Sequence, residues 1–241
     1  MIKITDLKVI YDNDFVSLDS ISFNIDEGEC VGLIGPNGAG KSTLFRSLTG
    51  LIDHEGTILV DGVEVTSKNL SEIRKKIGYV IQESDDQMFM PTVIEDMIFG
   101  PVNYGGNKDD VIKEADKILA KLKISHLKEK YNHKLSGGEK KMASIATILM
   151  MKPDIILFDE PTSSLDPSNR RLVMNTIKEV KGTKIIASHD LDLVYDICDK
   201  VILMNKGKVI KVGGKDEILR DKTLLESNDL ELPLSFSSHN I

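Results

Sequence analysis

A short apolar run followed at once by a glycine-rich loop is the feature that most limits what this chain can fold into. The run, residues 30–34, carries no charge and suits a strand buried on both faces of a parallel sheet. The loop after it, residues 35–42, reads Gly-Pro-Asn-Gly-Ala-Gly-Lys-Ser and leads into a helical pattern. In this order the loop amides and the helix N-terminus face a bound anion. The pattern therefore predicts an α/β fold that binds a phosphate group at the edge of a parallel sheet.

The residues of this loop are the predicted phosphate contacts. They are Gly35, Pro36, Asn37, Gly38, Ala39, Gly40, Lys41, Ser42 and Thr43. We expect Lys41 to reach the β- and γ-phosphates of a nucleotide and Ser42 to bind Mg²⁺. The alternative is a glycine-rich turn that arises by chance, which we expect in about one chain in 100 of this size. The buried strand before the loop favours the phosphate-binding interpretation.

A second apolar run, Ile155–Phe158, ends in two carboxylates, Asp159 and Glu160. Ligands of open α/β sheets bind at the carboxyl ends of the strands, so we expect both side chains beside the phosphate loop. Asp159 suits a Mg²⁺ ligand, and Glu160 suits the base that orients and deprotonates a water. The alternative is a pair of charges that caps the helix after Pro161, which we would favour only for an isolated Asp-Glu.

Two further polar residues follow predicted strands and are expected at the same edge. Gln82 ends the strand predicted at 77–82 and can bind the attacking water or Mg²⁺. His189 follows the apolar strand that ends at Ser188, and a neutral imidazole can donate to the γ-phosphate. Each residue taken alone has a plainer interpretation, as a surface glutamine and a structural histidine.

Between these strands, from about Glu83 to Met151, the apolar period changes to that of helices. Ser136-Gly137-Gly138 presents a hydroxyl and free amides just before the helical run 140–151. That arrangement suits an anion-binding helix start and equally a simple helix cap. The spacing alone leaves both interpretations open.

Composition limits the class of partner. The chain has 31 basic and 38 acidic residues, a net charge of −7, which argues against bulk nucleic-acid binding. No segment approaches the roughly 18 consecutive apolar residues of a membrane span, and the N-terminus has no signal-peptide pattern. We therefore expect a soluble cytoplasmic protein that reaches a membrane only through partners. Cys30 and Cys198 are expected to be buried thiols rather than a disulfide or metal site.

Taken together, these motifs resemble the ATP-binding cassette (ABC) ATPases along roughly residues 1–220. Their order is the phosphate loop, Gln82, Leu-Ser-Gly-Gly-Glu, Asp-Glu, Ser-Leu-Asp and Ser-His-Asp. The resemblance implies a P-loop NTPase with a RecA-like core and an antiparallel β sub-domain, which together cover 1–82 and 153–220. It also implies an inserted helical sub-domain at 83–152, a C-terminal tail at 221–241, and ATP and Mg²⁺ as cofactors.

In that family two chains form a head-to-tail dimer, which implies a second ATPase chain, either identical or paralogous. The residues that would contact the ATP held by the partner are Leu135, Ser136, Gly137, Gly138 and Glu139. Asp166 would link the two sites across the interface. Tyr11 matches the aromatic residue that stacks on adenine, and its alternative is an ordinary strand residue.

A narrower resemblance, carried by residues 79–89, 91–93 and 99–101, is to the ATPases of energy-coupling factor importers, the cobalt-transport branch above all. It implies a short helix after Gln82 in the groove that receives the membrane subunit. The implied docking residues are Asp85, Asp86, Gln87, Met88 and Phe89. For the last two the alternative is core packing.

The implied function is an ATP-hydrolysing subunit at the cytoplasmic face of the membrane, importing cobalt, nickel or a vitamin. Its partners would be an integral membrane scaffold subunit and a substrate-binding membrane subunit. The alternatives are an exporter ATPase, a soluble ABC ATPase that acts on DNA or ribosomes, and an ATP sensor without activity. The sensor would have lost the base, yet Glu160 is present.

Overall fold

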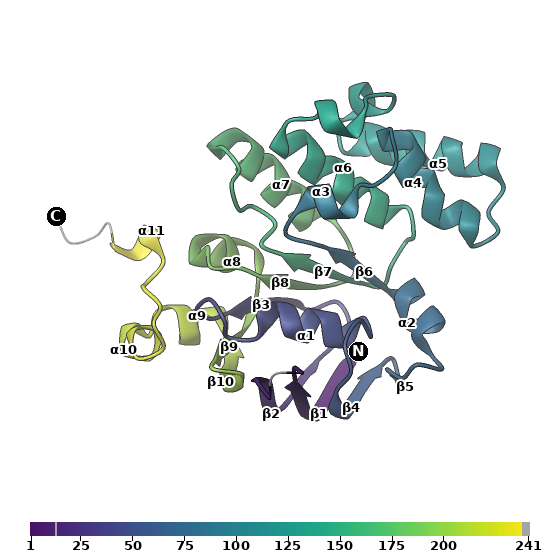
Figure 1. Ribbon diagram of the computed structural model, residues 1–241. Helices are drawn as coiled ribbons and strands as arrows, with labels where there is room; N and C mark the ends of the chain where they lie inside the picture. Colours follow the sequence, from purple (N-terminus) through teal and green to yellow (C-terminus); the bar gives the residue numbers. More distant parts are fainter. Residues whose placement is uncertain (13, 238–241) are drawn as a thin grey trace.

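A six-stranded sheet forms the centre of the computed structural model, which describes residues 1–12 and 14–237 (Figure 1). The strand order is β10-β9-β3-β8-β7-β6. Five of the strands are parallel, and β10 pairs antiparallel with β9 at one edge. The strands are β3 (Cys30–Ile34), β6 (Ile77–Val80), β7 (Ile155–Asp159), β8 (Thr183–Ala187), β9 (Lys200–Asn205) and β10 (Lys208–Gly214). The carboxyl ends of the parallel strands therefore share one edge, as the sequence pattern predicts.

The apolar strands β3 and β7 are buried along their whole length, because both faces of the sheet are covered. Successive side chains of β7 enter two different hydrophobic clusters. Ile155 and Leu157 join the cluster that contains α1 (Lys41–Leu48), whereas Ile156 and Phe158 join the cluster that contains the helical region. This alternation is the period of two expected for a strand between two apolar layers.

A second, four-stranded sheet is antiparallel and confirms the predicted β sub-domain. Its order is β2-β1-β4-β5. The strands are β1 (Ile2–Ile10), β2 (Val16–Ile25), β4 (Glu55–Val60) and β5 (Val63–Glu64). Leu44, Phe45 and Leu48 of α1 share one cluster with residues of both sheets, so α1 is packed between them. The helix α2 (Leu70–Lys76) then leads the chain back to β6.

The helical region lies above the parallel sheet in Figure 1. It consists of α3 (Ser84–Gln87), α4 (Val93–Asn103), α5 (Lys108–Lys121), the short 3₁₀ turns Ser125–Leu127 and Asn132–Lys134, and α6 (Gly137–Leu149). Asn107 caps α5 by accepting from the amides of Asp109 and Asp110. In the described part of the chain, no helix is both long and apolar enough to span a bilayer.

The C-terminal helices are α7 (Pro167–Glu179), α8 (Leu191–Ile197), α9 (Lys215–Leu219), α10 (Lys222–Glu226) and α11 (Leu234–Ser237). After residue 220, where the C-terminal tail is predicted to begin, the chain continues to pack on the preceding helices. Leu225 is fully buried, Asp192 accepts hydrogen bonds from the amides of Leu234 and Ser235, and the Phe236 ring packs edge-on against Tyr195. Residues 238–241 of the predicted tail lie outside the described residues.

The two cysteines are buried and free, as predicted, but they are neighbours in space. The Sγ atoms of Cys30 on β3 and Cys198 after α8 lie 3.9 Å apart. Both thiols belong to the cluster that packs against the helical region.

Candidate active site

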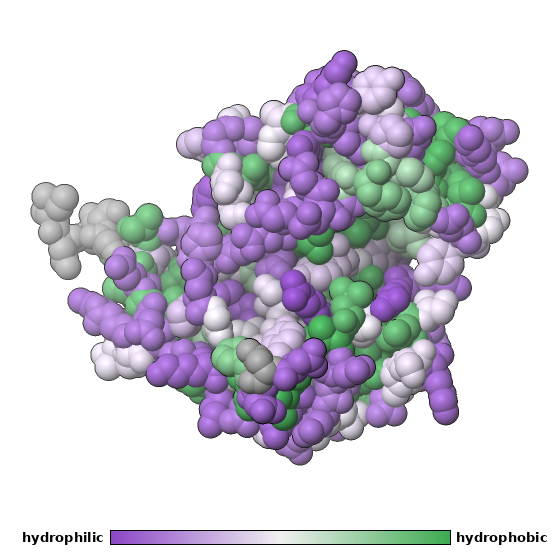
Figure 2. Space-filling view, viewed as in Figure 1, coloured by the Kyte–Doolittle hydropathy of each residue, from purple (hydrophilic) through white to green (hydrophobic). Residues whose placement is uncertain are grey.

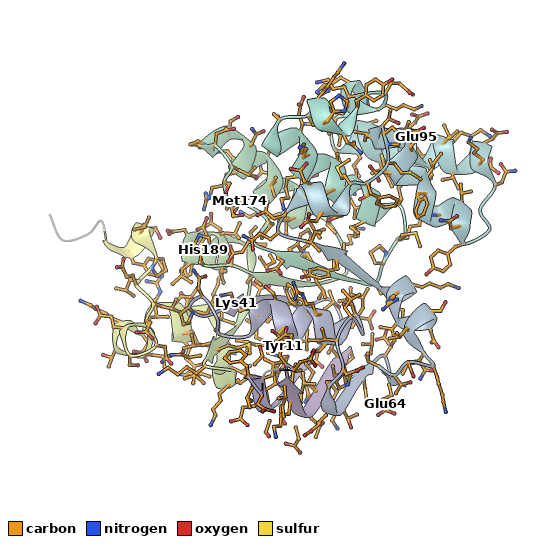
Figure 3. The ribbon with its side chains drawn as sticks, in the orientation of Figure 1. Tyr11, Lys41, Glu64, Glu95, Met174 and His189 are labelled. Carbon is orange, nitrogen blue, oxygen red and sulfur yellow. The ribbon has the colours of Figure 1, made fainter. Side chains whose placement is uncertain are left out.

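A cleft of about 680 Å³ opens at the carboxyl edge of the parallel sheet. The loops after β3, β6, β7 and β8 all contribute to it, because those four strands are neighbours in the sheet. Figure 3 labels Tyr11, Lys41 and His189, which reach the cleft from three different segments. The predicted residues that line it are Tyr11, Gly35, Pro36, Asn37, Gly38, Ala39, Gly40, Lys41, Ser42, Thr43, Gln82, Asp159, Glu160 and His189.

The phosphate loop depends on glycine at two positions. Gly40, the residue before α1, has a φ of 102°, and a Cβ there would lie 2.8 Å from the carbonyl oxygen of Ser17. A Cβ on Gly35 would lie 2.2 Å from the carbonyl oxygen of Met204. Other residues disfavour such a φ and would meet backbone atoms that cannot move aside. The loop therefore lies close against the neighbouring backbone at these two positions.

Lys41 is folded back into this loop. Its ammonium donates to the carbonyl oxygens of Gly35, at 2.6 Å, and Pro36, at 3.1 Å. Burial lowers the pKa of Lys41, and the nearby carboxylates of Glu160 and Asp159 oppose that shift. The cation thus lies where the loop would hold an anionic phosphate.

The first turn of α1 is tied to the N-terminal strands. The hydroxyl of Thr43 lies 2.8 Å from that of Ser17 and 3.2 Å from that of Tyr11. Tyr11 therefore faces the cleft as predicted, and stacking on adenine stays a prediction. Sequence reasoning missed four residues that also line the cleft, namely Phe15, Ser17, Asp229 and Leu230. The sequence signal that could have indicated Phe15 is a second aromatic residue shortly after Tyr11.

The carboxylate pair and His189 come together at the ends of β7 and β8. Glu160 has a φ of 43°, a rare conformation for a side chain of this size. Its carboxylate accepts from the His189 amide at 3.0 Å and the Ser188 hydroxyl at 3.1 Å, and it lies 2.8 Å from Nδ1 of His189. Such strain persists where hydrogen bonds hold it, and it is frequent at functional sites.

Asp159 suits a Mg²⁺ ligand. Its side chain is 4% exposed and accepts a hydrogen bond of 2.9 Å from the hydroxyl of Tyr79. Burial and the Asp159 charge raise the pKa of Tyr79, so the phenol stays protonated and donates. A buried carboxylate with a neutral partner is well matched to a cation, and Mg²⁺ prefers oxygen ligands together with phosphates and water. Ser42 and Gln82 add oxygen donors on the same cleft.

The Leu-Ser-Gly-Gly-Glu segment, residues 135–139, lies away from the chain's own phosphate loop. Ser136 caps α6, since its hydroxyl accepts from the Glu139 amide while the Glu139 carboxylate accepts from the Ser136 amide. Gly137 of this segment lines a surface groove together with Ser164 and Leu165, the two residues before Asp166. Asp166 caps α7 by accepting from the amides of Ser168 and Asn169. Contact between this segment and ATP in a partner chain stays a prediction.

The predicted docking segment divides into buried and exposed parts. The expectation that Met88 is exposed for docking is wrong, because its side chain is 7% exposed and belongs to the core of the helical region. Gln87 has an internal role, since it hydrogen-bonds to Ile81 and Ser144. Asp85 forms an ion pair with Lys140, and Asp86 is exposed. Phe89 is 65% exposed.

Phe89 has one aromatic neighbour at the surface. Its ring packs edge-on against Phe99, with a centroid separation of 4.9 Å, and Phe99 is itself exposed. The face of the molecule in Figure 2 is mostly hydrophilic, and hydrophobic residues gather beside the hollow between the helical region and the lower sheet. An exposed pair of phenylalanines is unusual on a protein with few aromatic residues and suits an interaction surface.

A glycine-rich loop at a helix start, next to a carboxylate pair on a parallel sheet, defines a P-loop nucleotide-binding ATPase. The family model described as ABC transporter matches residues 18–163. A putative ABC transporter ATP-binding protein of Geobacter sulfurreducens is 41% identical over 236 residues, which cover 98% of this chain and 95% of that protein. The chain therefore belongs to the ABC transporter ATP-binding proteins, and it is an ATP hydrolase coupled to transport.

Two further comparisons agree on sequence and on fold. The energy-coupling factor transporter ATP-binding protein of Methanocaldococcus jannaschii is 41% identical over 239 residues, which cover 97% of this chain and 86% of that protein. The structure of cbiO1 from Clostridium perfringens, part of the ABC transporter complex cbiONQ, has a TM-score of 0.84 at 36% identity. The matched region covers all of this chain and 98% of the cbiO1 chain. The predicted fold class is thus confirmed.

Proposed function

We propose that this chain is the ATP-hydrolysing subunit of an energy-coupling factor importer. The near-full-length similarity to the Methanocaldococcus protein carries the proposal. The chain would work at the cytoplasmic face of a membrane, together with a membrane scaffold subunit and a substrate-binding membrane subunit. The exposed pair Phe89 and Phe99 gives such a scaffold an apolar surface to contact.

Different residues of the cleft would bind the phosphates, hold the attacking water and bind Mg²⁺. ATP would lie with its phosphates in the loop 35–42, and Lys41 would exchange the carbonyls of Gly35 and Pro36 for phosphate oxygens. Glu160, Gln82 and His189 would hold the attacking water, with Glu160 as the base. Mg²⁺, held by Ser42 and Asp159, would neutralise charge on the phosphates.

The glutamate already has two fixed donors, the Ser188 hydroxyl and the His189 amide, which hold its carboxylate in place. The His189 side chain is mostly exposed, so its ring has room to turn from Glu160 toward a γ-phosphate. These donors fix the position of the proposed base, so that little reorganisation is needed before proton transfer.

A second cassette would complete each site. Ser136, Gly137 and Gly138 do not line the cleft, and Gly137 lines a separate surface groove, so the ATP they contact would be that of the partner. Every predicted catalytic position is filled in this chain, so a homodimer would have two working sites, and a paralogous partner fits the same geometry.

Two single substitutions separate docking from packing in the segment after Gln82. Phe89→Ser should leave the melting temperature and the ATPase activity of the purified chain unchanged but uncouple transport, since its ring is exposed. Met88→Ser should lower the free energy of unfolding by about 2–5 kcal/mol, as for other truncations of buried side chains. Thermal denaturation, ATPase assays and uptake by the reconstituted transporter measure these effects. A loss of ATPase activity in Phe89→Ser would contradict the docking role.

The transported substrate is the finer part of the proposal: a metal ion such as cobalt or nickel, or a vitamin. To test it, a tagged Glu160→Gln chain is expressed in its native cell and recovered from membranes in mild detergent. We expect a multi-span scaffold and a small substrate-binding membrane protein to co-purify, and the ligand on the latter identifies the substrate. Recovery of only soluble partners, ribosomes or DNA would contradict the importer. If the chain belongs to an exporter, a membrane protein should co-purify without the small substrate-binding subunit.

A further inference from the structure

Lys141, on α6, is a buried cation that the chemistry above does not use. The residue is 3% exposed, and its ammonium donates to the carbonyl oxygens of Ile81, at 3.0 Å, and Gln82, at 2.7 Å. Burial lowers the pKa of Lys141 to about 8, although the charges of Glu83 and Asp159 oppose that shift. Both hydrogen-bond acceptors are neutral backbone groups. The ammonium therefore loses its hydration on burial, and no ion pair compensates for that loss.

The same short loop is tied to α6 from its other side. The Gln87 side chain accepts from the Ile81 amide at 3.1 Å and donates to the Ser144 carbonyl at 2.8 Å and the Thr147 hydroxyl at 3.2 Å. The backbone of Ile81 therefore donates its N–H to Gln87 of α3, which is itself hydrogen-bonded to α6, and its C=O accepts from Lys141 of α6.

These hydrogen bonds join two parts of the proposed function that are far apart in the sequence. The loop carries Gln82, whose side chain lines the nucleotide cleft. The helix α6 begins at Gly137, within the segment expected to contact the ATP of the partner chain. A shift of α6 along its axis would carry Lys141 with it and pull on the carbonyl of Gln82.

We propose that Lys141 is a positioning residue for Gln82, which it holds in register with α6 so that the position of this helix sets where the Gln82 side chain lies in the cleft. The inference rests on the proposed role of Gln82 in hydrolysis. If Lys141 had only a structural role, its removal would have the same effect with and without the Gln82 side chain.

A double-mutant cycle with Gln82→Ala separates the two roles, with kcat and KM for ATP measured on the purified chain. Lys141→Met keeps the apolar stem and removes the ammonium. It should lower kcat by about 10- to 100-fold, the loss expected when a reacting group is misplaced by about 1 Å. The KM for ATP should change less than about twofold, since the phosphate loop is untouched. In the Gln82→Ala background, Lys141→Met should change kcat by less than about twofold, because no side chain is left to position.

Two further variants keep the test decisive. Lys152→Met removes an exposed lysine that pairs with Glu114 in the same helical region, and it should leave kcat unchanged. If Lys141→Met does not fold, Gln87→Met cuts the second tie and should show the same dependence on Gln82. Equal losses of kcat with and without the Gln82 side chain would overturn the inference and leave the proposed function intact. A Gln82→Ala chain with normal kcat would remove the proposed role of Gln82 itself, and this inference with it.

Discussion

Replacing Glu160 with glutamine should stop ATP turnover and leave ATP binding intact. The site should keep its geometry, because the glutamine side chain has nearly the shape of the carboxylate. The glutamine can accept from the His189 amide through its oxygen and donate to the Ser188 hydroxyl through its NH2 group, which replaces the other carboxylate oxygen. It cannot take a proton from water, and loss of a general base lowers kcat by about 10²–10⁴-fold. With hydrolysis blocked, two chains should stay closed around ATP, which gel filtration with ATP detects as a stable dimer.

The matched control is Glu179→Gln, a change of the same chemistry on an exposed residue at the end of α7. It should hydrolyse ATP at the normal rate and leave the dimer transient. A Glu160→Gln chain that remains monomeric under saturating ATP would contradict the ATP-bound dimer. A Glu160→Gln chain that still hydrolyses ATP would mean that a different residue is the base.

Replacing Lys41 with alanine should remove both binding and hydrolysis. The ammonium is the cation buried inside the phosphate loop, and charge-assisted hydrogen bonds are worth about 1.5–3 kcal/mol. The Kd for ATP should therefore rise by about 10- to 100-fold, and kcat should fall as well, because the same group stabilises charge on the leaving phosphates. Isothermal titration calorimetry with ATP measures the first effect.

Lys3→Ala is the control, since Lys3 is exposed on β1 and far from the loop in sequence. It should bind ATP with unchanged affinity. A Lys41→Ala chain with normal affinity would mean that the loop amides alone hold the phosphates and that the lysine has no part in binding.

The core of the fold and most of the cleft could be predicted because their signals are local. Residues 30–42 contain a buried strand, its loop and a helix start in one stretch, and Asp159 follows its strand directly. Parallel strands bring their carboxyl ends to one edge, so the sequence also predicts Gln82 and His189 beside them, and both line the cleft.

The rest depends on contacts that no local pattern contains. Lys141 lies 60 positions from Ile81, Tyr79 lies 80 from Asp159, and Cys30 lies 168 from Cys198. The burial of Met88 could not be separated from docking in the sequence, because the helix before it, α3, has four residues, too few to reveal which face is apolar. The leucines after residue 220 are scattered among polar residues, which hid the burial of Leu225.

The route of the chain into the helical region has a mechanical consequence. The chain leaves the parallel sheet at β6, its edge strand, and returns through β7, the strand next to it. No β ladder joins residues 84–149 to the sheet, which they contact through the side chains of one shared hydrophobic cluster. A tilt of this region would therefore slide that packing and bend the two short connections. One of those connections carries Gln82. Such a tilt would strain the backbone, at the edge of the sheet, next to a residue that lines the cleft.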